Sequence, residues 1–176
     1  HYGPEILGFL VARLRAKSDG DEAFSLFAED VWKGLPSFGF RCSVRAWLYA
    51  LARNAANRYA IAPQRRRARN LTLGGDQALS ALVDRVRTAT QVYARTNVKS
   101  KMRELRERLA VEDQTLLILH VDRALPWREL AIVMHERGTE LDDAELQREA
   151  ARLRKRFERV KAELRELAIS EGVFKP

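Results

Sequence analysis

Residues 43–60 read SVRAWLYALARNAANRYA, and this stretch decides the fold of the first half of the chain. Ser43 can cap the first turn of a helix, so the stretch predicts a helix through about Ala60. At about 100° per residue, apolar side chains share one arc of this helix. They are Val44, Trp47, Leu48, Leu51, Ala55 and Tyr59. The opposite face carries a polar group at every fourth position: Arg45, Tyr49, Arg53 and Asn57. We therefore expect one face, including Trp47, to be buried in the core and the other to be open.

The rest of the chain also has helical periodicity. Gly (9) and Pro (5) are few, while Ala, Leu, Arg and Glu are abundant, a composition that favours helix. A turn is expected at residues 18–21. Further helices are predicted at residues 4–15, 21–35, 98–109, 111–121, 126–134 and 144–168. The predicted fold class is all-α, with two small helical domains at residues 1–62 and 96–176, joined by a basic linker at 63–95. The chain begins without methionine, and we expect its first helix to be truncated.

Composition places the chain among packed proteins. Of its 176 residues, 46% are hydrophobic and 32% are charged, too apolar a mix for a disordered chain. Cys42 is the single cysteine, which excludes an internal disulfide and indicates a reducing compartment. No stretch approaches the roughly 20 apolar residues that a membrane span requires. We expect a cytoplasmic protein with no membrane partner.

The charge is positive and unevenly distributed. The net charge is +8, and residues 31–75 contain nine Lys or Arg and no acid. A second basic segment, Arg148 to Lys161, holds seven bases and two acids. Ordinary solvated surfaces mix both signs, so the acid-free segment indicates contact with a polyanion.

The long last helix has the same two-faced pattern. Its apolar stripe consists of Leu146, Ala150, Leu153, Phe157, Val160, Leu164 and Ala168. The opposite face carries Arg148, Arg152, Lys155 and Arg159. A short helix at residues 126–134 precedes it, which fits a helix-turn-helix. The charged outer face of a helical bundle is the alternative.

Two blocks resemble a known family. RAWLYALARN, residues 45–54, resembles the R-x-W-L-x-x-I-A-R-N signature of sigma factor region two, and WKGLPSF, residues 32–38, looks like the segment before it. LAVEDQTLLIL at 109–119 and LPWRELA at 125–131 resemble the opening of sigma region four. The two blocks stand in the order found in extracytoplasmic-function (ECF) sigma factors. The likeness covers nearly the whole chain.

The resemblance implies a DNA-binding transcription factor without enzymatic activity. In this family the first domain grips the clamp of core RNA polymerase and opens the minus-ten promoter element. The second reads the minus-thirty-five element with its helix-turn-helix. Core RNA polymerase and promoter DNA are thus the implied partners, and an anti-sigma factor is a common further one. The candidate minus-ten contacts are Phe38, Phe40, Arg41, Ser43, Arg45, Tyr49, Arg53 and Asn57, with core packing as the alternative for the two phenylalanines.

Region four supplies a second set of candidates. RKRF at residues 154–157 resembles the K-S-R-L stretch of the family's recognition helix. The candidate DNA contacts are Arg148, Arg152, Lys155, Arg156 and Arg159. Arg154 and Lys161 flank the apolar stripe, and we expect them to contact phosphates or other residues of the chain.

The chain departs from the family at two places besides its truncated first helix. An acidic insertion, residues 135–143, lengthens the turn of the helix-turn-helix. The helix that contacts polymerase in the family carries D-A-E-D-L-x-Q-E-x-F, which here reads DGDEAFSLFA at residues 19–28. Its acidic start is kept and its Gln-Glu pair is lost. By resemblance, Asp19, Asp21 and Glu22 are the candidate polymerase contacts.

No pattern for catalysis is present. His1, His120 and His135 do not pair with Cys42 or with acids at a metal-ligand spacing, so no metal or cofactor is expected. Phosphate loops, nucleophile elbows and HExxH are absent. Two binding alternatives stay open: a free-standing helix-turn-helix regulator that binds duplex DNA as a dimer, and an RNA-binding helical protein.

Overall fold

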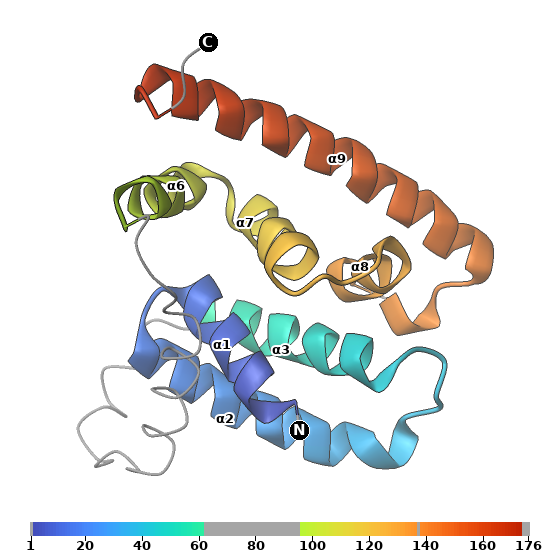
Figure 1. The fold of residues 1–176 in the computed structure, drawn as a ribbon. Helices are drawn as coiled ribbons and strands as arrows, with labels where there is room; N and C mark the ends of the chain where they lie inside the picture. Colours follow the sequence, from blue (N-terminus) through green and yellow to red (C-terminus); the bar gives the residue numbers. More distant parts are fainter. Residues whose placement is uncertain (1, 62–95, 137, 174–176) are drawn as a thin grey trace. The chain divides into compact units, whose positions relative to one another are not determined.

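The computed structural model describes residues 2–61, 96–136 and 138–173 (Figure 1). The chain divides into two compact units, residues 1–91 and 92–176. All regular elements of the described ranges are helical, with no strand among them, which confirms the all-α prediction there. The predicted basic linker, residues 63–95, lies outside the described residues.

The first unit is built from three helices that contact one another pairwise. They are α1 (Gly3–Leu14), α2 (Lys17–Gly34) and α3 (Val44–Ile61), with a short 3-10 turn, η1 (Leu35–Ser37), after α2. The core consists of Ile6, Leu7, Phe9 and Leu10 of α1, Ala23 and Phe27 of α2, and Ala46, Trp47, Tyr49, Ala52, Ala55, Ala56 and Tyr59 of α3. Because small alanines dominate the α3 contribution, two neighbouring helices can approach it closely.

Helix α2 begins earlier than the sequence predicts. Residues 18–21 were expected to form a turn, but they are the first turn of α2. Gly20 is buried there, and a Cβ on it would lie 2.5 Å from Val11 Cγ2 and 3.1 Å from Val11 Cα. The glycine therefore serves the close approach of α1 and α2, not a turn.

The predicted cap of α3 is confirmed, and its predicted core is confirmed in part. The backbone N–H of Ala46 donates to Ser43 Oγ at 3.0 Å, the hydrogen bond expected of an N-cap serine. Trp47, Ala55 and Tyr59 of the predicted apolar arc are buried, whereas Val44 at the start of the helix is exposed. One end of the arc therefore reaches the surface.

The second unit is organised along one long helix, α9 (Asp143–Ser170). Preceding it are α6 (Thr96–Arg108), α7 (Val111–Leu117), the π-helical turn η2 (Ile118–Asp122), α8 (Trp127–Met134) and the 3-10 turn η3 (Gly138–Glu140). Helices α6, α7 and α8 all contact α9 and lie along one side of it (Figure 1). The single helix predicted at 111–121 changes from α to π geometry at Ile118.

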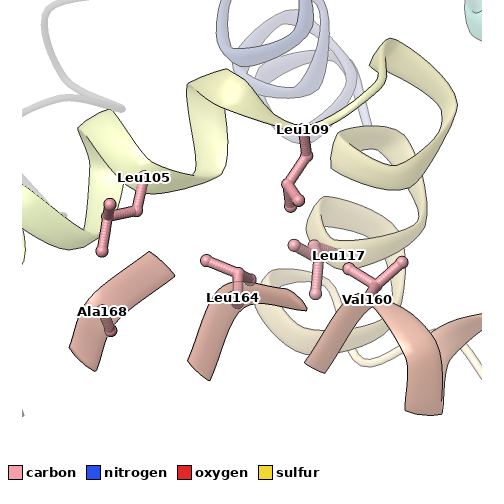
Figure 2. Packing of buried hydrophobic residues seen from close by; sticks show 6 residues of the cluster. All are labelled: Leu105, Leu109, Leu117, Val160, Leu164 and Ala168. Atoms are coloured by element: carbon pink, nitrogen blue, oxygen red, sulfur yellow. The ribbon is translucent and has the colours of Figure 1, made fainter. Parts of the chain in front are cut away.

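The apolar stripe predicted for α9 is its packed side. Figure 2 shows Val160, Leu164 and Ala168 of α9 facing side chains of the α6 and α7 segments, Leu105, Leu109 and Leu117. Leu146, Ala150 and Leu153 are buried toward the other end of α9, which packs on α8. Phe157, between the two groups, is half-buried. The cationic face predicted opposite this stripe is thereby turned away from the core.

The acidic insertion builds the start of α9. Asp142 Oδ1 accepts a hydrogen bond from the Glu145 N–H at 2.7 Å, and Glu145 Oε2 accepts one from the Asp142 N–H at 3.0 Å. This reciprocal pair is a capping box. Arg128 of α8 also pairs with Asp143 at 2.5 Å. The inserted acids thus cap the last helix and tie it to α8.

Among the helices of the described ranges, none is both long enough and apolar enough to span a membrane.

Candidate nucleic-acid interface

An aromatic loop, residues 38–43, connects η1 to α3. The Phe38 ring lies 4.7 Å from that of Trp47, and the Phe40 ring lies 4.8 Å from that of Phe38, centroid to centroid. Trp47 is buried, Phe38 is half-buried, and Phe40 is 81% exposed. The three rings form a series from the core to the surface. Core packing therefore accounts for Phe38 but not for Phe40.

Phe40 is held in a costly backbone conformation. Its φ of +53° lies in the left-handed region, which costs a residue with a Cβ on the order of 1–2 kcal/mol. Such strain persists only where the surrounding structure imposes it, and it concentrates at functional sites. Arg41, beside it, is exposed, and no acid occurs anywhere from residue 31 to 75. The loop therefore presents an aromatic face and a cation together.

The polar face of α3 is not open, contrary to the sequence prediction. Tyr49 is 0% exposed, and its hydroxyl donates to Glu5 Oε1 on α1 at 2.7 Å. The same oxygen accepts from Arg45 Nε at 3.1 Å and Nη2 at 2.5 Å. One carboxylate of α1 thus holds a phenol and a guanidinium of α3. The Tyr49 ring also packs edge-on against Phe9 at 5.3 Å.

The far end of this face is covered as well. Arg13 of α1 donates from Nη2 to Asn57 Oδ1 at 2.5 Å, and Arg53 is only 8% exposed. The expectation that Arg45, Tyr49, Arg53 and Asn57 form a surface row is therefore wrong. The physical reason is that α1 carries Glu5 and Arg13 at positions that complement these groups. Sequence periodicity detects a polar face but not a polar partner for it.

The acidic start of α2 is also partly internal. Asp19 Oδ1 accepts from the Tyr59 hydroxyl at 2.6 Å, and Asp19, Asp21 and Glu22 are all half-buried. Oδ1 of Asp21 is buried and has no hydrogen-bond partner among the described residues. Burial raises the pKa of the Asp21 carboxyl; nearby Lys17 lowers it and Glu22 raises it. The predicted polymerase contacts are therefore not an open acidic surface.

The cationic face of α9, in contrast, is open. Arg148, Arg152, Lys155 and Arg159 are all exposed. Within the described part of the chain, neither a hydrogen bond nor an ion pair holds the side chains of Arg148, Lys155 and Arg159. The row of cations predicted from the sequence is thus present on the surface of the second unit.

Three neighbouring cations are engaged within the unit. Arg156 Nε donates to Asp113 Oδ1 of α7 at 2.5 Å, and both side chains are largely buried. Arg154 stacks over the Trp127 ring at 5.7 Å and Lys161 over the Phe157 ring at 5.1 Å. Arg154 and Lys161 thus make the intramolecular contacts that their flanking positions suggested. Arg156, expected to contact DNA, instead joins α7 to α9.

Arg152 differs from the other exposed cations of α9 because it has an acidic partner. Its Nη2 donates to Glu149 Oε1 at 2.9 Å; the Arg152 side chain is 70% exposed, whereas that of Glu149 is 10% exposed. A hollow of about 240 Å³ opens beside this pair. Its lining residues are His135, Leu141, Glu145, Arg148, Glu149 and Arg152.

Sequence reasoning missed Glu5, Arg13 and Glu149. Glu5 and Arg13 look like ordinary polar positions of an amphipathic first helix, and nothing in the pattern links them to α3 some 40 residues later. Glu149 has a detectable signal: it lies between Leu146 and Leu153 in the apolar register of α9, where a carboxylate is unexpected.

Within the described ranges, no group of three or more His, Cys, Asp or Glu side chains could hold a metal ion. Comparison of the chain with protein-family models, curated proteins and solved structures found no match.

Proposed function

We propose that this protein is an alternative sigma factor that binds core RNA polymerase and directs transcription from specific promoters. The observation that carries the proposal is Phe40. Its backbone is held in a strained conformation, and its aromatic ring is exposed beside Arg41. Ordinary packing does not account for such a ring, whereas capture of an unstacked base does. The ordered pair of sigma-like blocks makes promoter DNA the expected source of that base.

The aromatic loop is suited to strand opening. A base leaving the duplex loses its stacking, and an exposed aromatic face replaces part of that energy. Phe38 packs against Phe40 and is itself packed against the buried Trp47, so the Phe40 ring is connected to the folded core. Arg41 can bind the adjoining phosphate. The proposed minus-ten contact is therefore this loop, not the face of α3 that α1 covers.

The cationic face of α9 is suited to duplex binding. Lys and Arg side chains in a row along a helix can neutralise phosphates on both sides of a major groove. Helix α8 packs against α9, as the first helix of a helix-turn-helix does. The proposed minus-thirty-five contacts are accordingly Arg148, Arg152, Lys155 and Arg159.

One observation favours the second candidate, a free-standing helix-turn-helix regulator. Tyr49 and Arg53 are buried, so the first unit has a smaller candidate DNA surface than its sequence suggested. A regulator would need only the α9 face and would bind a specific duplex without polymerase.

The first experiment is co-elution of the full-length protein with bacterial core RNA polymerase, followed by transcription from a library of linear promoters. We expect a stable complex and transcripts from a restricted set of promoters. Tight binding to a specific duplex without any polymerase binding would replace the proposal by the regulator. Absence of both activities would reject both candidates.

The role of Phe40 is tested on a promoter obtained in this way. Because stacking of one base on an aromatic ring is worth about 1–3 kcal/mol, we expect Phe40→Ala to reduce promoter opening about 5- to 150-fold. Duplex binding should change little. Permanganate reactivity of unpaired thymines measures opening. Phe40→Tyr, which keeps the ring, is the matched control and should open the promoter normally; normal opening by Phe40→Ala would contradict the role of the loop.

A further inference from the structure

The exposed cations of α9 are not equivalent. Arg148, Lys155 and Arg159 extend into solvent with no ion pair to any residue in the described part of the chain. Arg152 is also mainly exposed, but Nη2 of its guanidinium donates a hydrogen bond to Glu149. Only one of the four cations thus has its direction set before any ligand arrives.

Glu149 is suited to this task because it does not move freely. Its side chain is 10% exposed and lies in the buried register of α9, between Leu146 and Leu153. Carboxylates are seldom buried unless they are paired. Arg152, one turn further along, is the partner. The anchor is therefore part of the packed side of the helix, while the group that it holds stands on the open side.

The bound guanidinium keeps most of its donors. An arginine has five N–H donors in a planar fork, and the hydrogen bond to Glu149 uses one of them. Guanine is the base that matches such a fork, because its O6 and N7 both accept hydrogen bonds in the major groove. A pre-oriented fork also loses less rotamer freedom on binding than a free side chain does. Untethered cations instead suit phosphates, which need charge more than direction.

We infer that Arg152 reads a guanine in the major groove and that Glu149 is the positioning residue that aims it, while Arg148, Lys155 and Arg159 contact phosphates. The inference rests on the proposed function, because it requires α9 to enter DNA. The sequence pattern did not distinguish among the four exposed cations of α9, and the inference assigns base reading to one of them.

The test begins with selection of duplexes from a randomised library by the full-length protein in complex with core polymerase. Affinity is then measured for the selected duplex and for versions in which each guanine in turn is replaced. One bidentate contact corresponds to about 5- to 150-fold discrimination. We expect Arg152→Ala and Arg152→Lys to lose this factor at a single G·C pair. Retained discrimination at every position would overturn the base-reading role.

Glu149 is tested by Glu149→Gln, which removes its charge at nearly constant size. Discrimination at the same G·C pair should fall about tenfold, because Arg152 loses a hydrogen bond to a charged partner. Affinity for non-specific duplex should stay level or rise, because a negative charge near the phosphates has been lost. Glu158→Gln is the matched control: it makes the same charge change at an exposed position of α9 and should leave discrimination intact.

A second variant guards against loss of folding. Glu149→Met places an apolar side chain in the buried register, so it should fold at least as well as the native chain and still lose discrimination. If both folded Glu149 variants discriminate normally, or lose affinity equally for all duplexes, the pair is only structural and the inference is overturned. If the native complex has no sequence preference, the proposed function fails as well.

Discussion

Helices α3 and α9 have the same sequence pattern and different surroundings. Each has an apolar stripe and, opposite it, polar groups spaced about four residues apart. In α3 that polar face is covered by α1, whose Glu5 binds Arg45 and Tyr49. In α9 the polar face is exposed. Arg152 on this face is held by a hydrogen bond to Glu149 of the same helix.

A polar helix face is not by itself a binding interface. A helix packed by one layer of neighbours keeps its second face open, as α9 does against α6, α7 and α8 (Figure 1). Helix α3 contacts both α1 and α2, and α1 supplies complementary polar groups. The covered cations of α3 therefore contribute to stability, and the exposed cations on the open face of α9 are available for binding.

The largest expected effect separates binding from folding on α9. Reversing two exposed cations that have no acidic partner in the described part of the chain, in Lys155→Glu together with Arg159→Glu, should weaken promoter binding on the order of a hundredfold. The thermal midpoint should change by only a few degrees, because both side chains point away from the stripe. Filter binding at several salt concentrations, with a melting curve, measures both. Unfolding of this variant, or unchanged affinity in the folded protein, would contradict the conclusion that the open face of α9 serves binding and not stability.

A smaller effect is expected where α1 covers α3. Glu5→Ala removes the acceptor of Arg45 and Tyr49 and leaves a mostly buried guanidinium without that carboxylate. We expect unfolding free energy to fall by about 2 kcal/mol, measured by urea denaturation. Glu29→Ala, which removes an exposed carboxylate paired with Lys33, is the control and should cost below about 1 kcal/mol. Equal effects of the two substitutions would mean that the hydrogen bonds of Glu5 to α3 add no more to stability than an exposed ion pair does.

The smallest effect concerns the acidic start of α2. Since burial raises the pKa of Asp21 in the folded state, the native protein binds this proton more tightly than the unfolded chain. The stabilising contribution is therefore present at low pH and is lost as pH rises through the raised value. Asp21→Asn should increase the melting temperature slightly at neutral pH and reduce the pH dependence above pH 4. Melting curves at several pH values test this, and a lower melting temperature at neutral pH would contradict it.

Much of the fold was predictable because it depends on local chemistry. Periodicity located the described helices, and the Ser43 cap and the buried Trp47 were both anticipated from the order of residues around them. The turn predicted at residues 18–21 was wrong because Gly20 has two possible uses. Glycine permits a turn and also a close helix contact, and only the position of Val11 distinguishes them.

Some features of the candidate sites could also be predicted from the sequence, and others could not. Exposure of Arg148, Arg152, Lys155 and Arg159 followed from their positions opposite a long apolar stripe. Burial of Tyr49 and Arg53 did not follow, because it depends on α1. Arg156 was predicted at the surface and pairs with Asp113 instead, a residue 43 positions away in the sequence.

By itself, the sequence determined the helical class, most helix boundaries and the direction of each apolar stripe, since these depend on residues within a turn or two of one another. The packing of the helices sets which polar face is covered, which cations are paired and which aromatic rings are left in solvent. These outcomes depend on groups such as Glu5 and Arg45, which are distant along the chain and meet only after the helices pack.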